Sequence, residues 1–205
     1  MFKLVLFDFD GVLVDSLSVY EKTVTECLQK IGSQIVQNRE DFLALFNNNF
    51  YEALAENGID LEEFSRISTP ILQAVAVADI IPFDSVCKCV EQIKIPIAII
   101  SSNSAQAIKA VFEYWNMKPF FREIFGSEFR YSKKEKIDYA MKMFGVMPKD
   151  TIYVGDTVGD IKEARQAGVM VAAVSWGWHN RKHLEEAMPD YLVDTPEELL
   201  AVIKL

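Results

Sequence analysis

Short runs of apolar residues recur along this chain, and each is followed by polar residues and then by a segment with helical periodicity. Apolar runs without alternation indicate strands that are buried on both faces of a sheet. Strands that alternate with helices predict a parallel sheet covered by helices on both faces. We therefore expect an α/β fold, with strands near residues 3–9, 95–100, 123–126, 151–154, 169–174 and 191–193.

One long stretch breaks this alternation. Between Ser16 and Ile93 no strand pattern is present, and the apolar residues follow helical spacing. A purely helical block of this size inside a strand–helix chain indicates an insertion. We expect a core domain formed by residues 1–15 and 82–205, and an inserted helical domain formed by residues 16–81.

Two aspartates, Asp8 and Asp10, stand where the first expected strand ends. Residues two apart in an extended backbone point the same way, so both carboxylates can face one small volume. Gly11 follows at once and allows the chain to turn sharply. Two like charges held this close repel each other. Either one carboxylate is protonated or a cation lies between them.

Further polar groups follow the later strands. Ser101 ends one strand, Asp156 and Asp160 follow another, and Lys133 begins a helix. Taken singly, the two later aspartates fit a turn and an N-cap as well as a metal site. In parallel sheets, however, ligands bind at the carboxyl ends of the strands, so we expect all these groups to converge.

The chemistry of the converging groups indicates phosphoryl transfer. Carboxylate ligands without His or Cys favour Mg²⁺. The hydroxyl of Ser101, with free backbone amides at Ser102 and Asn103, is a predicted anion site. A lysine can neutralise the charge on a phosphoryl group during its transfer. The set as a whole predicts a carboxylate nucleophile.

The same residues resemble the four motifs of the haloacid dehalogenase superfamily of phosphohydrolases, in order and in spacing. The matching segments are Asp8-Phe9-Asp10-Gly11-Val12-Leu13-Val14-Asp15-Ser16, then Ser101, then Lys133 or Lys134, then Gly155-Asp156-Thr157-Val158-Gly159-Asp160. Residues 153–167 and 174–178 are most similar to the phosphoglycolate phosphatase branch. The resemblance covers the whole chain. It implies a Rossmann-like core with a small helical cap inserted after the first strand.

The resemblance also implies an activity, that of a Mg²⁺-dependent phosphatase acting on a small phosphate monoester. Asp8 is the implied nucleophile, which forms an aspartyl phosphate. Asp10 is the implied general acid and base, a role that requires a raised pKa. Ser101 and Lys133 are the other implied catalytic residues, both contacting the phosphoryl group.

A metal site and a phosphate site are implied as well. The metal would be held by Asp8, by Asp156 and by the backbone carbonyl of Asp10, with Asp160 acting from further out. The phosphate site is implied to comprise Gly11, Ser101, Ser102, Asn103 and Lys133. We favour Lys133 over Lys134 because its spacing to the fourth motif fits the short form of the third.

Three rival functions remain open on the sequence alone. A sugar phosphomutase of the β-phosphoglucomutase type uses the same core residues but protects the aspartyl phosphate from water. A halide-releasing dehalogenase needs no metal, so Asp10 and Asp156 count against it. A non-catalytic binding protein is the third rival, and the filled catalytic positions count against it.

Composition narrows partners and location. Lys and Arg number 21 against 30 Asp and Glu, a net charge of −9, which argues against binding nucleic acid or anionic membranes. Cys27, Cys87 and Cys89 match no zinc spacing, no signal-peptide pattern is present, and no apolar run approaches the ~18 residues of a membrane span. We expect reduced thiols and a cytoplasmic protein that acts on a small phosphorylated metabolite. The oligomeric state stays open.

Other polar residues are interpreted as structural. His179 and His183 lie four apart with no third ligand nearby, so we expect surface histidines. Arg39 and the run Asn47-Asn48-Asn49 are expected at solvated helix and loop positions.

Overall fold

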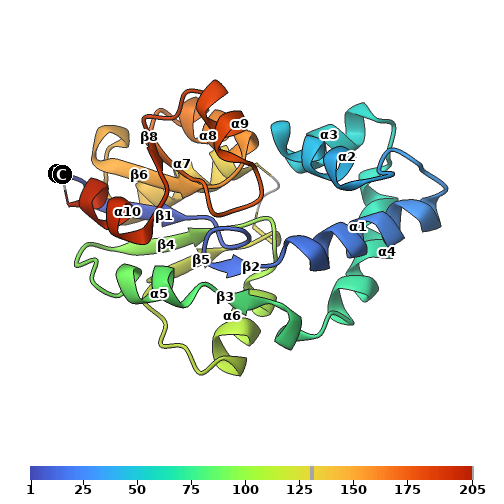
Figure 1. Cartoon of the computed structure of the whole chain (residues 1–205), viewed down its shortest axis with the longest axis horizontal. Coiled ribbons are helices and arrows are strands. Elements are labelled where there is room, and N and C mark those ends of the chain that lie inside the picture. Colours follow the sequence, from blue (N-terminus) through green and yellow to red (C-terminus); the bar gives the residue numbers. More distant parts are fainter. Residues whose placement is uncertain (130–131, 205) are drawn as a thin grey trace.

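The structure is a computed structural model that describes residues 1–129 and 132–204. Its centre is a six-stranded sheet with the strand order β5-β4-β1-β6-β7-β8, in which every neighbouring pair is parallel (Figure 1). This confirms the expected Rossmann-like α/β core. The strands are β1 (Leu4–Phe7), β4 (Ile97–Ile100), β5 (Glu123–Phe125), β6 (Thr151–Gly155), β7 (Met170–Val174) and β8 (Tyr191–Val193).

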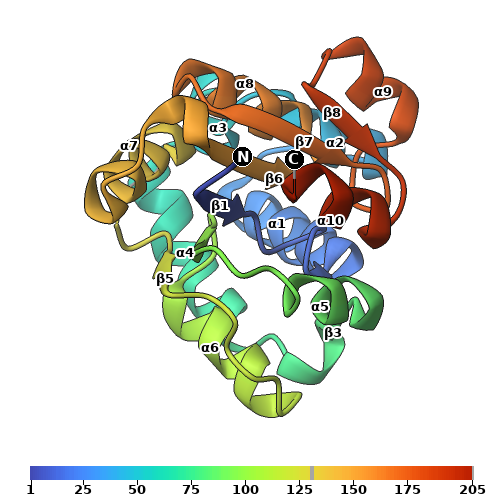
Figure 2. The same ribbon diagram turned by 90° about the vertical axis from the view of Figure 1, so that its left-hand side faces the viewer.

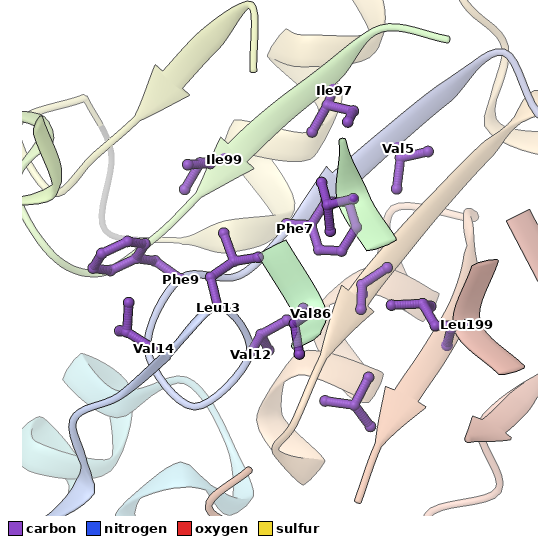
Figure 3. Packing of buried hydrophobic residues seen from close by; sticks show 14 of the residues in the cluster. Val5, Phe7, Phe9, Val12, Leu13, Val14, Val86, Ile97, Ile99 and Leu199 are labelled. Atoms are coloured by element: carbon purple, nitrogen blue, oxygen red, sulfur yellow. The ribbon is translucent and has the colours of Figure 1, made fainter. Parts of the chain in front are cut away.

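Helices cover both faces of this sheet, because its strands are apolar on both sides (Figure 2). Along β1, Val5 and Phe7 pack into one cluster, and Leu4 and Leu6 pack into the other. Figure 3 shows the first cluster, in which Phe7 lies near Ile99 on the neighbouring strand. The helices of that face are α5 (Asp84–Val90), α6 (Ala105–Tyr114) and α10 (Pro196–Ile203), and those of the other face are α7 (Lys133–Phe144), α8 (Val158–Gln166) and α9 (Arg181–Glu186).

The helical insertion has a hydrophobic core of its own, built around Phe42, Leu54 and Phe64. We call the elements α1–α4 the cap, and we propose residues 16–81 as its bounds. Figure 1 shows the cap beside the sheet-containing core rather than over one of its faces. Its elements are α1 (Leu17–Ile31), α2 (Arg39–Ala44), η1 (Leu45–Asn47), α3 (Phe50–Glu56), α4 (Leu61–Gln73) and η2 (Val77–Asp79).

The two connections between core and cap form a small antiparallel ribbon. Strand β2 (Val14–Asp15) pairs with β3 (Ile81–Pro82), so the chain enters and leaves the cap at one place. The expectation that no strand lies between Ser16 and Ile93 is therefore wrong at Ile81–Pro82. Two residues are too few to show a strand periodicity in the sequence.

The carboxyl ends of three adjacent strands lie at the edge of the sheet nearest the cap. Asp8 follows β1, Ser101 follows β4 and Asp156 follows β6, and β4, β1 and β6 are neighbours in the sheet. This arrangement brings residues that are far apart in sequence to one place. Across the described residues, no helix combines the length and apolar character that crossing a membrane requires.

Candidate active site

Asp8 is buried at the end of β1, where the backbone holds it in place. Its N–H donates to the carbonyl of Val154 on β6, at 2.9 Å. Its Oδ1 accepts from the N–H of Phe9 at 2.7 Å, and its Oδ2 accepts from Nζ of Lys133 at 2.6 Å. Burial raises the pKa of Asp8 to about 7, against the opposing effect of Lys133. A further positive charge at this carboxylate would favour its ionised form at neutral pH.

The chain turns sharply after Asp10 because of Gly11. Gly11 has a φ of +75°, a region that residues with a Cβ rarely adopt. A Cβ there would also lie 2.0 Å from Oδ2 of Asp156. The turn leaves Asp10 half-buried, with an Oδ1 that has no hydrogen-bond partner among the described residues. Burial raises the pKa of Asp10 to about 6.

Asp160 belongs to the first turn of α8. The side chain of Thr157 caps this helix, and Oδ2 of Asp160 returns the bond by accepting from the Thr157 N–H at 3.0 Å. Its Oδ1 accepts from Lys133 at 2.5 Å and from the Tyr153 hydroxyl at 3.0 Å. Burial acts to raise the pKa of Asp160, but Lys133, Thr157 and Tyr153 outweigh it and lower that pKa. Asp160 is thus an ionised residue that fixes the lysine.

Asp156 is buried between two glycine-containing turns. Its Oδ2 accepts from the N–H of Trp178 at 2.7 Å, whereas its Oδ1 is buried without a partner among the described residues. A Cβ at Gly177 would lie 2.3 Å from Cβ of Asp156, so this approach requires glycine. Burial and the neighbouring charges of Asp160 and Asp8 raise the pKa of Asp156 well above its usual value.

These carboxylates fit a divalent metal ion. Asp8, Asp156 and Asp160 can each offer an oxygen such that all three lie within 4.8 Å of one another. Asp10 lines the same cavity, and Lys133 contacts two of the four carboxylates, Asp8 and Asp160. Asp10 and Asp156 each have a buried Oδ1 without a hydrogen-bond partner in the part of the chain that the structure describes. A donor set of oxygens alone, with surplus negative charge, suits Mg²⁺.

The two adjacent lysines lie in different surroundings. Lys133, the first residue of α7, is 9% exposed and contacts both Asp8 and Asp160. Burial acts to lower the pKa of Lys133, but the two carboxylates outweigh it and raise that pKa above its usual range. Lys134 points away and pairs with Asp138 at 2.5 Å on the surface of the same helix. Only the first of the two reaches the aspartates.

The loop after β4 makes contacts that the sequence did not predict. Ser101 is fully buried, and its hydroxyl accepts from the N–H of Asn103 at 3.0 Å. The expectation of a free amide at Asn103 is therefore wrong, since that amide is already used. The Asn103 side chain donates to the hydroxyl of Tyr20 in the cap. Ser101, Ser102 and Asn103 all line the same cavity as Asp8.

A second lysine of α7 was missed at the sequence level. Lys136 is completely buried, and its Nζ donates to the carbonyl of Ser101 at 2.5 Å. Burial and the charge of Lys133 lower the pKa of Lys136 to about 8. The spacing of three from Lys133 places both side chains on one helix face, which was the available signal.

Glu163 was also missed, and it joins the core to the cap. Its Oε1 accepts from the N–H of Lys133 at 2.7 Å, so it caps the helix that carries the lysine. The same carboxylate accepts from Nδ2 of Asn49 at 3.2 Å. The expectation that Asn49 is solvated is wrong, because it is buried in this contact.

His179 makes a second link between core and cap. It is 1% exposed, so the expectation of a surface histidine is wrong for this residue. Its Nδ1 accepts from the N–H of Val158 at 3.0 Å, which leaves the proton on Nε2 to donate to the carbonyl of Leu43. Burial lowers the pKa of His179, in keeping with this neutral form.

The aspartates lie in a cavity of about 1110 Å³ between the core and the cap. The core contributes the strand ends, and the cap contributes side chains from α1, η1, α3 and α4. Trp178 of the core packs into the cap against Phe46, with ring centroids 4.8 Å apart. The arrangement can bind a metal ion, hold an anion beside it and offer a carboxylate as nucleophile.

Comparison with known proteins points the same way. The family model for haloacid dehalogenase-like hydrolases matches residues 5–174. The phosphoglycolate phosphatase of Synechococcus elongatus is 28% identical over 206 residues, covering 97% of this chain and 96% of the relative. The pyrophosphatase PpaX of Listeria innocua is 24% identical, covering 97% and 95%.

Two solved structures share the fold. One is described as a predicted phosphatase from Clostridium acetobutylicum, with a TM-score of 0.85, 21% identity and full coverage of both chains. The other is a haloacid dehalogenase-like family hydrolase from Streptococcus pneumoniae, with a TM-score of 0.80, 22% identity and 98% coverage of both chains. At these identities the likeness bears on the fold alone.

Proposed function

The chain belongs to the haloacid dehalogenase-like hydrolase family, and we propose that it hydrolyses a small phosphate monoester in a Mg²⁺-dependent reaction through an aspartyl phosphate. One observation carries the proposal. The buried carboxylate of Asp8 lies 2.6 Å from Lys133 and shares a 4.8 Å cluster of oxygens with Asp156 and Asp160. The phosphatase relatives support the same reaction class, that of phosphoric monoester hydrolases.

The first half of the reaction is a transfer to Asp8. A carboxylate oxygen of Asp8 forms a bond to phosphorus while the bond from phosphorus to the ester oxygen breaks. Asp10 gives its proton to the departing alcohol oxygen. A pKa of about 6 supports this role, because a carboxyl with that pKa holds a proton in part at neutral pH and releases it readily.

The second half returns Asp8 to its starting state. Asp10, now ionised, takes a proton from a water molecule as the water oxygen forms a bond to the phosphorus of the acyl phosphate. The bond from phosphorus to the Asp8 oxygen breaks, which frees the Asp8 carboxylate and releases inorganic phosphate. Lys133 lies against Asp8 and neutralises charge on the phosphoryl oxygens through both steps. The Ser101 hydroxyl, buried at the end of β4, binds one of those oxygens.

Asp8, Asp156 and the backbone carbonyl of Asp10 are the proposed holders of Mg²⁺. Bound there, the ion supplies positive charge that ionises Asp8 and polarises the phosphoryl group. Asp160 orients Lys133 through its 2.5 Å contact. The three free thiols support a reducing compartment such as the cytoplasm.

The test is release of inorganic phosphate from a panel of monoesters, with Mg²⁺ and with a chelator. We expect release only with the metal, and trapping of a phosphorylated chain whose modified residue, mapped by mass spectrometry, is Asp8. Asp8→Asn removes both signals. Release that survives in Asp8→Asn contradicts the proposed nucleophile. Accumulation of a sugar bisphosphate, with little free phosphate, identifies a mutase instead.

A further inference from the structure

We infer that the substrate's leaving group is an uncharged alcohol, and that the cavity discriminates against phosphate esters that carry a second anionic group. The inference rests on the proposed phosphatase activity and narrows its substrate class. It comes from the charges and hydrogen-bonding groups that line the cavity beyond the reacting centre.

Among the described residues that line the cavity, Lys133 is the only cation. Its Nζ lies 2.6 Å from Asp8 and 2.5 Å from Asp160, so it belongs to the end of the cavity that receives the phosphoryl group. A carboxylate or second phosphate on the leaving group extends away from that end toward the cap. There it meets no compensating positive charge from the described lining, and desolvating an unpaired anion is unfavourable.

The acidic residues of the wall add to this effect. Glu128, Glu135 and Glu163 line the cavity in addition to the aspartates. Glu163 is buried and accepts hydrogen bonds from the N–H of Lys133 and from Nδ2 of Asn49. A negatively charged leaving group would be repelled by these residues, whereas a neutral one would not.

The cap wall offers groups that suit hydroxyls. Helix α4 presents Ser65, Ser68, Thr69 and Gln73 to the cavity, all of them uncharged. The hydroxyls of Ser68 and Thr69 donate to the carbonyl of Ser65 and can accept from a ligand. Aromatic and aliphatic side chains fill the spaces between them, among them Phe64. Such a surface binds the hydroxyls and carbon skeleton of a polyol or similar alcohol, since each hydroxyl can both donate and accept.

Tyr20 of α1 contributes a further uncharged hydroxyl to the cavity. Its hydroxyl accepts from Nδ2 of Asn103, so its own proton is left for another acceptor. The ring is half-buried in the same cavity as Asp10, the proposed proton donor.

The first experiment uses pairs of esters that differ in the charge of the leaving group. The first pair is 2-hydroxyethyl phosphate and 2-phosphoglycolate, and the second is glycerol 1-phosphate and 3-phosphoglycerate, with 4-nitrophenyl phosphate as a general reporter. We expect kcat/KM to be at least about tenfold higher for the neutral member of each pair. Equal or higher kcat/KM for the acidic members, with activity lost in Asp8→Asn, overturns this inference alone. No Asp8-dependent release from any ester, the reporter included, overturns the proposed function as well.

A charge added to the wall provides the second experiment. Thr69→Lys places a cation on the lining of α4, and Ala74→Lys adds the same charge at an exposed position just beyond that helix that does not line the cavity. We expect Thr69→Lys to raise kcat/KM for the acidic ester relative to its neutral partner by about tenfold, and Ala74→Lys to leave the ratio unchanged. Equal ratios in wild type and Thr69→Lys, with both variants folded by circular dichroism, contradict the inference.

Discussion

The core and the cap contribute different kinds of residue to the cavity between them. The core presents charged groups on strand ends and helix starts, where the backbone fixes them, as with Asp8 after β1 and Lys133 at the start of α7. The cap presents uncharged side chains such as Ser68 and Gln73 from a helix face. Under the proposed function, a few rigid positions set the reaction type, whereas substrate choice is spread over a surface. Changes in the core should therefore abolish turnover, and changes in the cap should redirect it.

The largest effect is expected at the core carboxylate. Asp8→Asn removes the nucleophile while keeping the shape of the side chain, so kcat should fall by about 10⁴-fold or more. Thr69→Ser in the cap, which keeps a hydroxyl, should stay within about threefold of wild type. Phosphate release under single-turnover conditions measures both. A comparable loss in the two variants would remove the distinction between core and cap.

The second-largest effect on kcat is expected at Lys133, which we compare with its neighbour Lys134. Lys133→Ala should lower kcat by about 10²- to 10³-fold, because it removes the cation that contacts Asp8. Lys134→Ala loses only an exposed pair with Asp138 and should change kcat by less than about threefold. Steady-state assays on purified variants decide between them. A greater loss from Lys134→Ala means that the proposed role of Lys133 is wrong.

A smaller effect is expected where core and cap meet. Glu163→Gln weakens two hydrogen bonds to this side chain, one from the N–H of Lys133 at the start of α7 and one from Asn49. We therefore expect kcat/KM to fall by about three- to tenfold. Glu186→Gln, at an exposed position on α9, is the matched control. A change in kcat indicates that the placement of Lys133 is affected, whereas a change in KM indicates that closure of the cap is affected. Identical kinetics in the two variants would exclude a positioning role for Glu163.

The smallest effect concerns stability and pH. The pKa of Lys136 is lowered to about 8 in the folded chain, from 10.5, so the unfolded chain binds more protons between these values. Below pH 8 the amine of Lys136 is charged, and the folded chain carries the full unfavourable free energy of burying that charge. This free energy becomes smaller as the pH rises toward 10, because the buried amine then loses its proton. The unfolding free energy of wild type should therefore rise over this range relative to Lys136→Met. Urea unfolding at pH 7.5 and 9.5 measures the difference, and a constant offset contradicts the pKa shift.

The core could be predicted from the sequence because its signals are local. The apolar run before Asp8 predicts both a strand and the place where that strand ends, and parallel pairing then fixes the neighbours of that end. The resemblance to the family's third motif favoured Lys133 over Lys134, and the structure places Lys133 against Asp8. The sequence is therefore sufficient to predict that these charged groups lie together.

The contacts between core and cap could not be predicted in the same way. Glu163 with Asn49, and His179 with Leu43, join residues more than a hundred positions apart, and each side chain taken alone is typical of a solvated surface. Their burial depends on how the cap is seated, which no periodicity encodes. The hydrogen bond from the N–H of Asn103 to the hydroxyl of Ser101 was not predicted either, because it depends on the geometry of the loop.

The ribbon of β2 and β3 has a consequence for how such a protein can diversify. Because Val14 lies opposite Pro82 and Asp15 opposite Ile81, the two crossings into the insertion stand side by side. A different insert can be spliced between these points while the strand register of the sheet stays as it is. Exchange of the insert at this one place is therefore a route by which a single catalytic core acquires new substrates.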